Sequence, residues 1–501
     1  MLGKKLYVLL LVIGLALFAG GCSSDSTPNK PNDPNDPNDP TKPIVINLDD
    51  YEWGEEFTPE TLGLTPGTDI TEIKINWYSD TETDEVSMVR FFDGANDFIE
   101  ETGDVLAITD HPSEGNSAHK VTVTGLKADT EYHYWVSNDG ENWSEEYKYM
   151  TPKTGSFRFA SIGDPQLTTG SQDSTSNLFS SDKTTAQGWL DTMEKVGLAN
   201  VNFIAGVGDQ VDITSNGSED EYRNFFAPQE LRSIPWAPAV GNHDRHYPFL
   251  YHYNLPNEQT FEKLQGAEYG NATNAQYADV EAAGNYWYRY NNTLFVVLNT
   301  SAYPTSTAAA EPIITRFDDT LTAAKAASPG YAWLFVQHHK STASVADHCA
   351  DLDIQYYVEA GFEELMTAHG VDFVLSGHDH VYARSYPLTG KKGGTPSVPD
   401  ITQGGSAITN PNGTIYVTMT TGSGLKYYDL FNQAGNLYVK DNAAYPYLVG
   451  GAAGSEAYAG FNILNYNNAA AAALVPGAIT DPELWTKEEG VLPVSNATYL
   501  Q

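Results

Sequence analysis

Cysteine and positive charge are scarce in this sequence. Cys22 and Cys349 are the two cysteines among 501 residues, so a disulfide framework cannot hold the fold, which must rely on its core or on bound metals. Lys and Arg number 27 against 65 Asp and Glu, giving a net charge of −38. A surface this acidic repels nucleic-acid backbones, and no nucleic-acid-binding domain is expected. The charge fits solubility at a cell surface, and it also attracts divalent cations.

Long apolar runs are also rare, and the one at the N-terminus, residues 6–18, is too short for a stable membrane span. Lys4 and Lys5 precede this run, and small residues lead from it to Cys22, which is the order of a secretory signal. The terminal cysteine makes the segment resemble a bacterial lipoprotein signal. The resemblance implies a signal peptide at residues 1–22, lipidation of Cys22, and an exported protein anchored in a bacterial membrane. An ordinary signal peptide with a chance cysteine is the alternative.

The following segment, residues 23–43, has no apolar side chain large enough to pack, and Pro-Asn-Asp repeats run through it. Such a segment cannot bury enough surface to order itself. We predict a disordered linker that lifts the folded part of the chain off the membrane.

Residues 44–152 are predicted to be all-β. Residues 73–78 and 120–124 alternate between apolar and polar side chains, as half-buried strands do. Residues 126–136 place a turn before an aromatic strand and resemble the tyrosine corner of immunoglobulin-like and fibronectin type III sandwiches. The three histidines near this region, His111, His119 and His133, lack the spacing of metal ligands and are interpreted as surface or strand residues.

Residues 153–430 form a second predicted unit, in which short apolar runs alternate with longer helical or loop stretches. The runs are residues 157–162, 201–207, 238–240, 294–298, 333–336, 371–375 and 415–419. Residues 184–196 show a helical pattern with one apolar face. Strands separated by helices predict an α/β fold with ligands at the strand ends. Residues 431–501 are rich in Asn, Ala and Gly and are predicted to be an extension of unknown role.

Polar side chains follow five of these apolar runs in a fixed order. The segments are Gly163-Asp164-Pro165-Gln166, Gly208-Asp209-Gln210-Val211-Asp212, Gly241-Asn242-His243-Asp244, Gln337-His338-His339 and Gly377-His378-Asp379-His380. Carboxylate and amide oxygens mixed with imidazole nitrogens suit Zn, Mn or Fe better than calcium. One such segment is usually a turn, but five in this order predict a metal site.

Residues 157–425 resemble a calcineurin-like metallophosphoesterase, and the β domain in front makes the purple acid phosphatase branch the nearer match, in its bacterial exported form. The likeness extends beyond the five segments to residues 285–288 and 294–299. It implies a four-layer α/β/β/α sandwich of two facing sheets flanked by helices, with the fibronectin III-like domain in front. It also implies a phosphoric ester hydrolase with two divalent or trivalent transition-metal ions, Fe, Zn or Mn.

The family's ligands carry over to six residues of this chain. Asp209 is expected to bridge both ions, and the others divide into Asp164 and His380 for the first ion and Asn242, His339 and His378 for the second. His338 is the alternative to His339, since either imidazole can follow a strand end. His339 is preferred because the segment from it to His348 resembles the family's stretch between two histidines.

Two residues depart from the family pattern. Many members have a histidine where this chain has Gln166, and the plant and animal purple enzymes have a tyrosinate where it has Asp212. We therefore expect a protein without purple colour, whose first ion lacks one usual ligand. Asp212 either supplies that ligand or orients His243, and the orienting role is preferred. Gln166 either contacts the metal or braces its loop, and bracing is preferred.

Phosphate esters resist hydrolysis because the attacking oxygen meets a shell of negative charge, and two close cations offset that charge and generate a hydroxide nucleophile. A shared carboxylate, Asp209, keeps the two cations together. His243, beside Asn242, is expected to act as general acid or transition-state stabiliser; a core histidine satisfied by Asp244 is the alternative. His348 resembles the family's histidine that contacts substrate phosphate, with a surface loop residue as the alternative.

The leading functional hypothesis is a phosphomonoesterase, similar to acid phosphatases, acting on small phosphorylated molecules. A phosphodiesterase or nucleotidase on the same site is the nearest rival, since the pocket walls that select the substrate cannot be read from one sequence. A surface binding or adhesion protein with a degenerate metal domain is the alternative of another class. The oligomeric state is left open.

Overall fold

The computed structural model describes the chain in segments between residues 53 and 464. These are 53–80, 86–95, 98–108, 116–168, 184–212, 218–344, 348, 351–380, 382–385, 387–390, 398–399, 413–419, 421–424 and 461–464. Residues 1–44 are a separate unit from residues 45–501. The predictions for the signal peptide, Cys22, the linker and His111 therefore fall outside the described residues. Within them, no helix has the length and apolar character needed to cross a bilayer.

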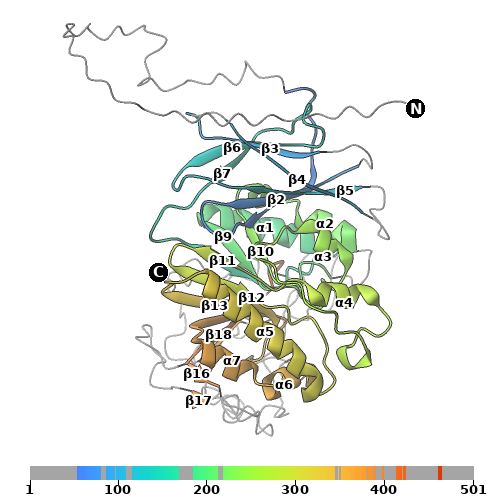
Figure 1. Ribbon diagram of the computed structural model, residues 1–501, viewed down its shortest axis with the longest axis vertical. Helices are drawn as coiled ribbons and strands as arrows, with labels where there is room; N and C mark the ends of the chain where they lie inside the picture. The colour runs from blue at the N-terminus through green and yellow to red at the C-terminus, as the bar shows by residue number, and fades with distance from the viewer. Residues whose placement is uncertain are drawn as a thin grey trace, which may run out of the picture. The chain divides into compact units, whose positions relative to one another are not determined.

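Seven antiparallel strands form the N-terminal domain, in the spatial order β1-β2-β5-β4-β3-β6-β7 (Figure 1). Their bounds are Glu60–Pro66, Ile73–Ser79, Ser87–Phe92, Ile99–Ala107, Ser117–Val123, Glu131–Ser137 and Tyr147–Met150 for β1 to β7. The first half of β4 pairs with β3 and its second half with β5. One strand thus joins two groups of strands, whose inward side chains share one core, among them Trp77, Val121, Phe91 and Tyr134. The predicted all-β domain is confirmed.

The tyrosine corner expected before β6 is present. The hydroxyl of Tyr132 accepts a hydrogen bond from the main-chain N of Lys127, 3.0 Å away. A buried tyrosine that bonds back to the chain just upstream is typical of immunoglobulin-like sandwiches. The more specific fibronectin type III assignment stays a prediction.

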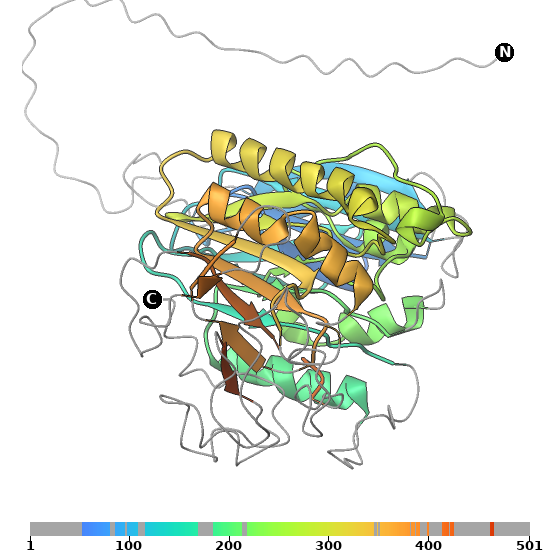
Figure 2. The ribbon, with the colours of Figure 1, turned by 90° about the horizontal axis from the view of Figure 1, so that it is seen from below.

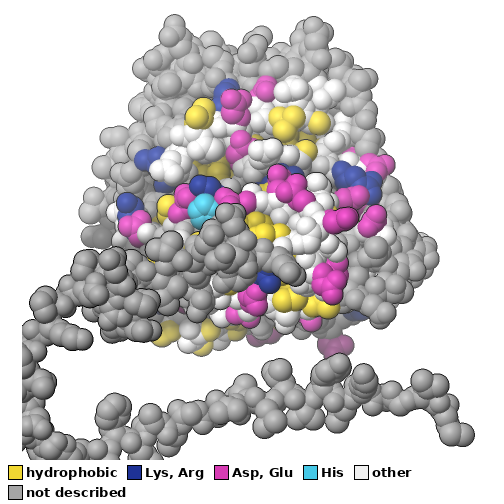
Figure 3. All heavy atoms as spheres, turned by 90° about the horizontal axis from the view of Figure 1, so that it is seen from above, with side chains coloured by type: hydrophobic (Ala, Val, Ile, Leu, Met, Phe, Trp, Pro, Cys, Tyr) yellow, Lys and Arg dark blue, Asp and Glu magenta, His cyan; other side chains and the backbone are white. Residues whose placement is uncertain are grey.

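The described histidines of this domain have structural partners, as the sequence predicts. His119 is buried between the hydroxyls of Ser87 and Ser79, at 2.8 and 2.9 Å. His133 lies on the surface and pairs with Glu146 at 2.7 Å. Figure 3 shows this end of the molecule, where acidic and basic side chains alternate around one exposed histidine.

Two large sheets form most of the described part of the second domain, and β16 and β17 form a further two-stranded sheet. The smaller one is parallel, with the order β10-β9-β8, and the larger one is mixed, with the order β11-β12-β13-β14-β18-β15-β19. The bounds in the smaller sheet are Phe159–Ile162 (β8), Phe203–Gly206 (β9) and Trp236–Pro238 (β10). Those in the larger are Tyr286–Tyr290 (β11), Thr293–Val297 (β12), Trp333–Lys340 (β13), Phe373–Gly377 (β14), Tyr382–Ser385 (β15), Ile415–Thr418 (β18) and Phe461–Leu464 (β19). Strand β19 comes from the extension that the sequence could not place, and it pairs antiparallel with β15.

Helices cover the outer side of each sheet, so the predicted four-layer fold is confirmed (Figure 2). On the smaller sheet lie α1 (Thr185–Leu198) and α2 (Glu219–Phe225), and α3 (Tyr247–His252) and α4 (Ala275–Ala282) follow. On the larger sheet lie α5 (Thr307–Ala327), α6 (Leu352–Glu359) and α7 (Phe362–His369). The short elements are η3 (Gln229–Arg232), η4 (Ala267–Tyr269), β16 (Leu388–Thr389) and β17 (Val398–Pro399). The helix predicted at residues 184–196 is α1, with Thr184 as its N-cap.

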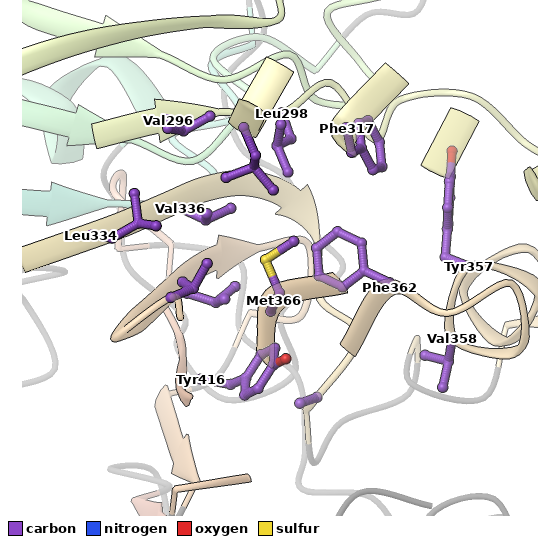
Figure 4. Packing of buried hydrophobic residues seen from close by; sticks show 14 of the residues in the cluster. Val296, Leu298, Phe317, Leu334, Val336, Tyr357, Val358, Phe362, Met366 and Tyr416 are labelled. Carbon is purple, nitrogen blue, oxygen red and sulfur yellow. The ribbon is translucent and has the colours of Figure 1, made fainter. Parts of the chain in front are cut away.

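Three apolar clusters separate these layers. Between the sheets, aromatic rings stack face to edge, with the ring centroids of Phe159 and Phe295 5.4 Å apart. Outside the larger sheet, Phe317, Tyr357 and Phe362 of α5, α6 and α7 pack over Val336 of β13 and its neighbours (Figure 4). A third cluster joins α1 and α2 to the smaller sheet. Because both faces of both sheets are buried, side chains meet solvent chiefly at the strand ends, where the polar segments lie.

Candidate metal centre

The polar segments all leave the carboxyl ends of their strands and converge. Asp164 follows β8, Asp209 follows β9, Asn242 follows β10 and His378 follows β14, while His339 lies near the end of β13. Parallel neighbouring strands end at the same edge of a sheet, and the two sheets face each other, so five distant segments meet in one place.

The backbone of these loops is unusual. Asp164, Asp209 and His378 have φ of 46°, 52° and 69°, in the left-handed region. A residue other than glycine held there costs about 1–3 kcal/mol, and such residues cluster at functional sites. Two neighbouring glycines make room: a Cβ on Gly241 would lie 2.0 Å from an oxygen of Asp209, and one on Gly377 would lie 2.4 Å from an oxygen of Asp164. Alanine at either position would displace a carboxylate.

Asp209 lies at the centre of the cluster. Its Oδ2 is 3.3 Å from Nε2 of His339, and that Nε2 is 2.9 Å from Oδ1 of Asn242. Asp209, His339 and His378 each present a ligand atom within 4.8 Å of the others. Carboxylate, amide and imidazole donors at this spacing suit a transition-metal ion.

A second group of ligand atoms adjoins this one. Nε2 of His380 is 3.4 Å from Oδ1 of Asp164, and the carboxylate of Asp164 accepts the main-chain N–H of His378 at 2.9 Å. The rings of His339 and His378 lie 4.9 Å apart between the two groups. All six predicted ligands are therefore together, and their donor types fit the metals that the sequence suggested.

The structure distinguishes His339 from His338. Nδ1 of His339 donates to the carbonyl of Val207 at 2.8 Å, which turns Nε2 towards Asp209; a ligand imidazole is commonly oriented in this way. His338 points to the other side of the sheet and packs on Phe362 of α7, with ring centroids 4.9 Å apart. Burial lowers the pKa of His338 to about 3. Of the two residues, His339 lies in the ligand cluster.

The side chain of Gln166 contacts the central carboxylate of Asp209. Its Nε2 donates to Oδ2 of Asp209 at 3.1 Å, so it braces the shared carboxylate. Its amide oxygen Oε1 is buried and has no hydrogen-bond partner among the described residues. A buried oxygen without a donor is costly unless a cation or water meets it, which is a further sign that the site fits a metal.

Hydrogen bonds hold the main-chain N and the Nδ1 of His243, and its side chain is partly exposed. Its main-chain N donates to Oδ1 of Asp209 at 2.9 Å, and its Nδ1 donates to the main-chain carbonyl of Asp212. Its Nε2 is 3.9 Å from Asp209, and 22% of the side chain is exposed. The orienting role expected of Asp212 is thus performed by its main-chain oxygen. Asp244 instead accepts the main-chain N–H groups of Gly241 and Gln210, at 2.8 and 3.1 Å.

His348 lies on the other side of the ligands. Its ring stacks on His378 with centroids 4.1 Å apart, and 29% of its side chain is exposed. Nδ1 of His348 is 2.8 Å from a carboxylate oxygen of Asp351. Sequence reasoning missed Asp351, which lies three residues after His348 and directly before α6.

Behind the centre lies a buried ion pair that the sequence did not reveal. The guanidinium of Arg245 binds the carboxylate of Glu281, with both side chains at most 5% exposed, and it stacks on Tyr277 at 4.1 Å. Arg245 belongs to the loop that carries His243. The pair therefore ties this loop to α4.

Replacing Arg245 by Met is expected to lower the free energy of unfolding by about 3–5 kcal/mol, because it leaves the charge of Glu281 buried without its partner. The matched control is Arg223→Met, whose ion pair with Asp220 is exposed and is expected to contribute less than about 1 kcal/mol. Urea unfolding monitored by fluorescence measures both. Equal losses in the two variants would contradict the stabilising role of the buried Arg245–Glu281 pair.

Metal binding is expected to strengthen as the pH rises. Burial alone lowers the pKa of His339, but the charge of Asp209 outweighs it, and the pKa in the metal-free protein is raised to about 9. The bound proton stabilises the metal-free fold below the usual pKa of histidine, and this contribution disappears as the pH passes about 9. A metal ion must displace this proton. Titration of metal-free protein with zinc should therefore show proton release and a higher affinity at about pH 8 than at about pH 6; an affinity independent of pH would contradict it.

Comparison with known proteins agrees with this geometry. Residues 59–151 match the family model described as the N-terminal domain of purple acid phosphatase, and residues 157–382 match the calcineurin-like phosphoesterase model. No curated protein matches the sequence. Among solved structures, the purple acid phosphatase PPD1 from yellow lupin (Lupinus luteus) is similar, with a TM-score of 0.53 and 17% identity.

The alignment with the lupin protein covers 74% of this chain and 66% of the lupin chain, so the chain spans slightly less than two thirds of that relative. At this identity the likeness concerns the fold. A dimetal phosphatase from Danio rerio is also found, with a TM-score of 0.34, 14% identity, and coverage of 53% of this chain and 88% of that one. Residues 157–382 therefore carry a domain that matches the calcineurin-like phosphoesterases, behind a domain that matches the N-terminal domain of purple acid phosphatase, and the lupin protein shares this fold.

Proposed function

We propose that this protein is a dinuclear phosphomonoesterase that releases phosphate from small phosphorylated molecules. The observation that carries the proposal is the convergence of six ligand side chains with Asp209 at their centre, beside the partly exposed rings of His243 and His348. When bound, a pair of transition-metal ions supplies positive charge to the phosphoryl oxygens and lowers the pKa of water. Asp164 and His380 would hold one ion, Asn242, His339 and His378 the other, and Asp209 both.

His243 is the proposed proton donor. Its Nδ1 proton is committed to the carbonyl of Asp212, so Nε2 is the atom that faces the site and gives a proton to the departing alkoxide oxygen. The contact of its main-chain N with Asp209 fixes the imidazole relative to the shared ligand. A leaving oxygen with a high pKa needs this proton most.

His348 is the proposed binding group for a phosphoryl oxygen. Asp351 contacts Nδ1 of its ring at 2.8 Å and so orients the imidazole beside the ligand cluster. A doubly charged monoester would gain more from a bound pair of metal cations than a singly charged diester would, which favours the monoesterase over the phosphodiesterase or nucleotidase.

Steady-state kinetics on 4-nitrophenyl phosphate and bis(4-nitrophenyl) phosphate, with metal analysis of the same protein, test the proposal. We expect about two transition-metal ions per chain and a higher kcat/KM on the monoester. A preference for the diester would identify the phosphodiesterase instead. Protein that purifies without such ions and hydrolyses neither substrate would support the binding protein.

We further propose that the enzyme acts outside the cytoplasm as a lipoprotein linked through Cys22. The signal pattern in residues 1–22 and the Pro-Asn-Asp linker after it support this location. Mass spectrometry of the mature N-terminus tests it, with a lipid on Cys22 as the expected result. A mature chain that begins elsewhere without lipid would refute it.

A further inference from the structure

The N-terminal β domain contacts the second domain at α3, the helix that directly follows the loop of His243. Nζ of Lys120, on β5, donates to the carbonyls of Leu250 and Tyr253 at 2.5 and 2.6 Å. The last carbonyls of a helix have no partner within it, and a cation there is favourable. Beside this contact, the amide of Asn254 donates to the carbonyl of Val121 at 3.2 Å. The β domain therefore caps the end of α3.

At its other end, α3 is continuous with the loop that carries His243. The main-chain N of Asp244 bonds to the carbonyl of Gly241 at 3.2 Å, that of His246 to Asp244 at 2.8 Å, and that of Phe249 to His246 at 3.1 Å. These bonds form an unbroken series from the loop into the helix. A shift of α3 would accordingly move the loop that holds His243.

The contacts from Lys120 through α3 form a first route from the β domain to the loop of His243. A second route leads to His243 itself. The ring of Tyr78, on β2, stacks on His252 with centroids 4.3 Å apart and planes 10° apart. His252 is buried and bonds to Glu219 of α2 at 2.7 Å.

In the same helix, Glu221 accepts the main-chain N–H of Asp212 at 2.8 Å. The carbonyl of Asp212 in turn accepts from Nδ1 of His243. The first route thus reaches the main chain of the His243 loop, and the second reaches Nδ1 of its imidazole.

We propose that the β domain is a positioning element for catalysis, in which Lys120 and Tyr78 fix α3 and α2 and so place His243 against the substrate. The catalytic part of this inference rests on the proposed function of His243. Lys120 and Tyr78 are positioning residues, since they act through other groups and do not contact the reacting atoms.

Lys120→Met in the full-length, metal-loaded protein tests the first route. Its matched control is Lys74→Met, because Lys74 lies on the neighbouring strand β2 and its Nζ donates to Thr122 within the β domain at 2.9 Å. Hydrogen exchange of residues 241–254 should be about tenfold or more faster in Lys120→Met than in the control, since local opening becomes easier. Exchange in β13 and β14 should be equal in both. Unchanged exchange at 241–254 would overturn the proposal.

Turnover provides the second readout. In Lys120→Met, kcat on an alkyl phosphate should fall about tenfold more than kcat on 4-nitrophenyl phosphate, because a displaced proton donor matters chiefly for a poor leaving group. A merely misfolded fraction would reduce both equally. In a His243→Ala background the extra loss should vanish. The positioning role would be overturned if His243→Ala is selective for the leaving group but Lys120→Met loses activity equally on both substrates.

Tyr78 tests the second route and covers the case in which Lys120→Met fails to fold. Tyr78→Leu removes the ring stack and should reproduce the faster exchange, whereas Tyr78→Phe keeps the stack and serves as its control. The hydroxyl of Tyr78 has no hydrogen-bond partner among the described residues, so its removal should change little. If His243→Ala proves unselective, the proposed role of His243 fails, and the exchange data alone decide whether the β domain fixes the loop.

Discussion

Asp209→Asn is expected to lose bound metal and phosphatase activity together. The carboxylate lies at the centre of the ligand cluster, 3.3 Å from His339, and an amide would present a single neutral oxygen where the proposed pair of cations needs a shared anion. Loss of a group that merely orients a ligand already costs about 10- to 100-fold in metal affinity. Loss of the shared ligand itself should exceed that, and elemental analysis after gel filtration should show far less than the wild-type metal content.

Asp220→Asn is the matched control for this experiment. Asp220 is acidic and close in sequence, but its side chain is exposed and pairs with Arg223 on α2. Its metal content and activity should equal those of the wild type. Removal of metal from the wild type by a chelator should reproduce the inactivity of Asp209→Asn, and added Zn, Mn or Fe should restore activity to the wild type alone. An Asp209→Asn protein with full metal and full activity would disprove the shared-ligand role.

His243→Ala is expected to keep its metal and lose turnover, with a loss that depends on the leaving group. General acid catalysis contributes about 10²- to 10⁴-fold, so kcat on an alkyl phosphate should fall within that range. Nitrophenolate departs without a proton, and the loss on 4-nitrophenyl phosphate should be much smaller. The ligand atoms are contributed by other side chains, so the metal content should stay at the wild-type value.

His133→Ala is the control that separates the role of His243 from the general effect of losing a histidine. His133 is about as exposed as His243, at 29% against 22%, but it lies on the β domain. Both substrates should be turned over normally by this control. A leaving-group-independent loss in His243→Ala would mean that the imidazole stabilises charge or structure and does not transfer a proton.

The sequence predicted those parts of the site that depend on local pattern. A Gly-Asp or Gly-Asn-His segment directly after a buried strand specifies both the residue type and its place at the sheet edge. For this reason the sequence alone predicts that Asp164, Asp209 and Asn242 lie close together. The α/β class followed from the same alternation of apolar runs and helices, and the four-layer sandwich was implied by the family resemblance.

What the sequence left open depends on which face of the sheet a side chain takes. His338 and His339 are adjacent in one strand, so their side chains point to opposite faces. The pairing of β13 with β14 also shifts register between Gln337 and Lys340. No local pattern settles the choice, because both faces of this sheet are buried. The hydrogen bond from His243 to the carbonyl of Asp212 could not be predicted for another reason. Every residue carries a carbonyl, so no residue type marks the one that accepts.

Contacts between distant segments were also beyond prediction from one sequence. Nothing in the sequence pattern indicates that Arg245 and Glu281 are buried as a pair. Nor does it indicate that Lys120 contacts the second domain. Their burial follows from the packing of elements that are far apart in the chain, and no spacing rule links them.

The left-handed backbone at Asp164, Asp209 and His378 has a consequence for the lifetime of the protein. Strain of this kind persists where surrounding interactions outweigh it, and a bound ion that stabilises the native state adds to those interactions by mass action. In a metal-starved environment these loops would be the first to open, and opened loops are where proteases cut. Scarcity of metal would then reduce the amount of the enzyme as well as its activity.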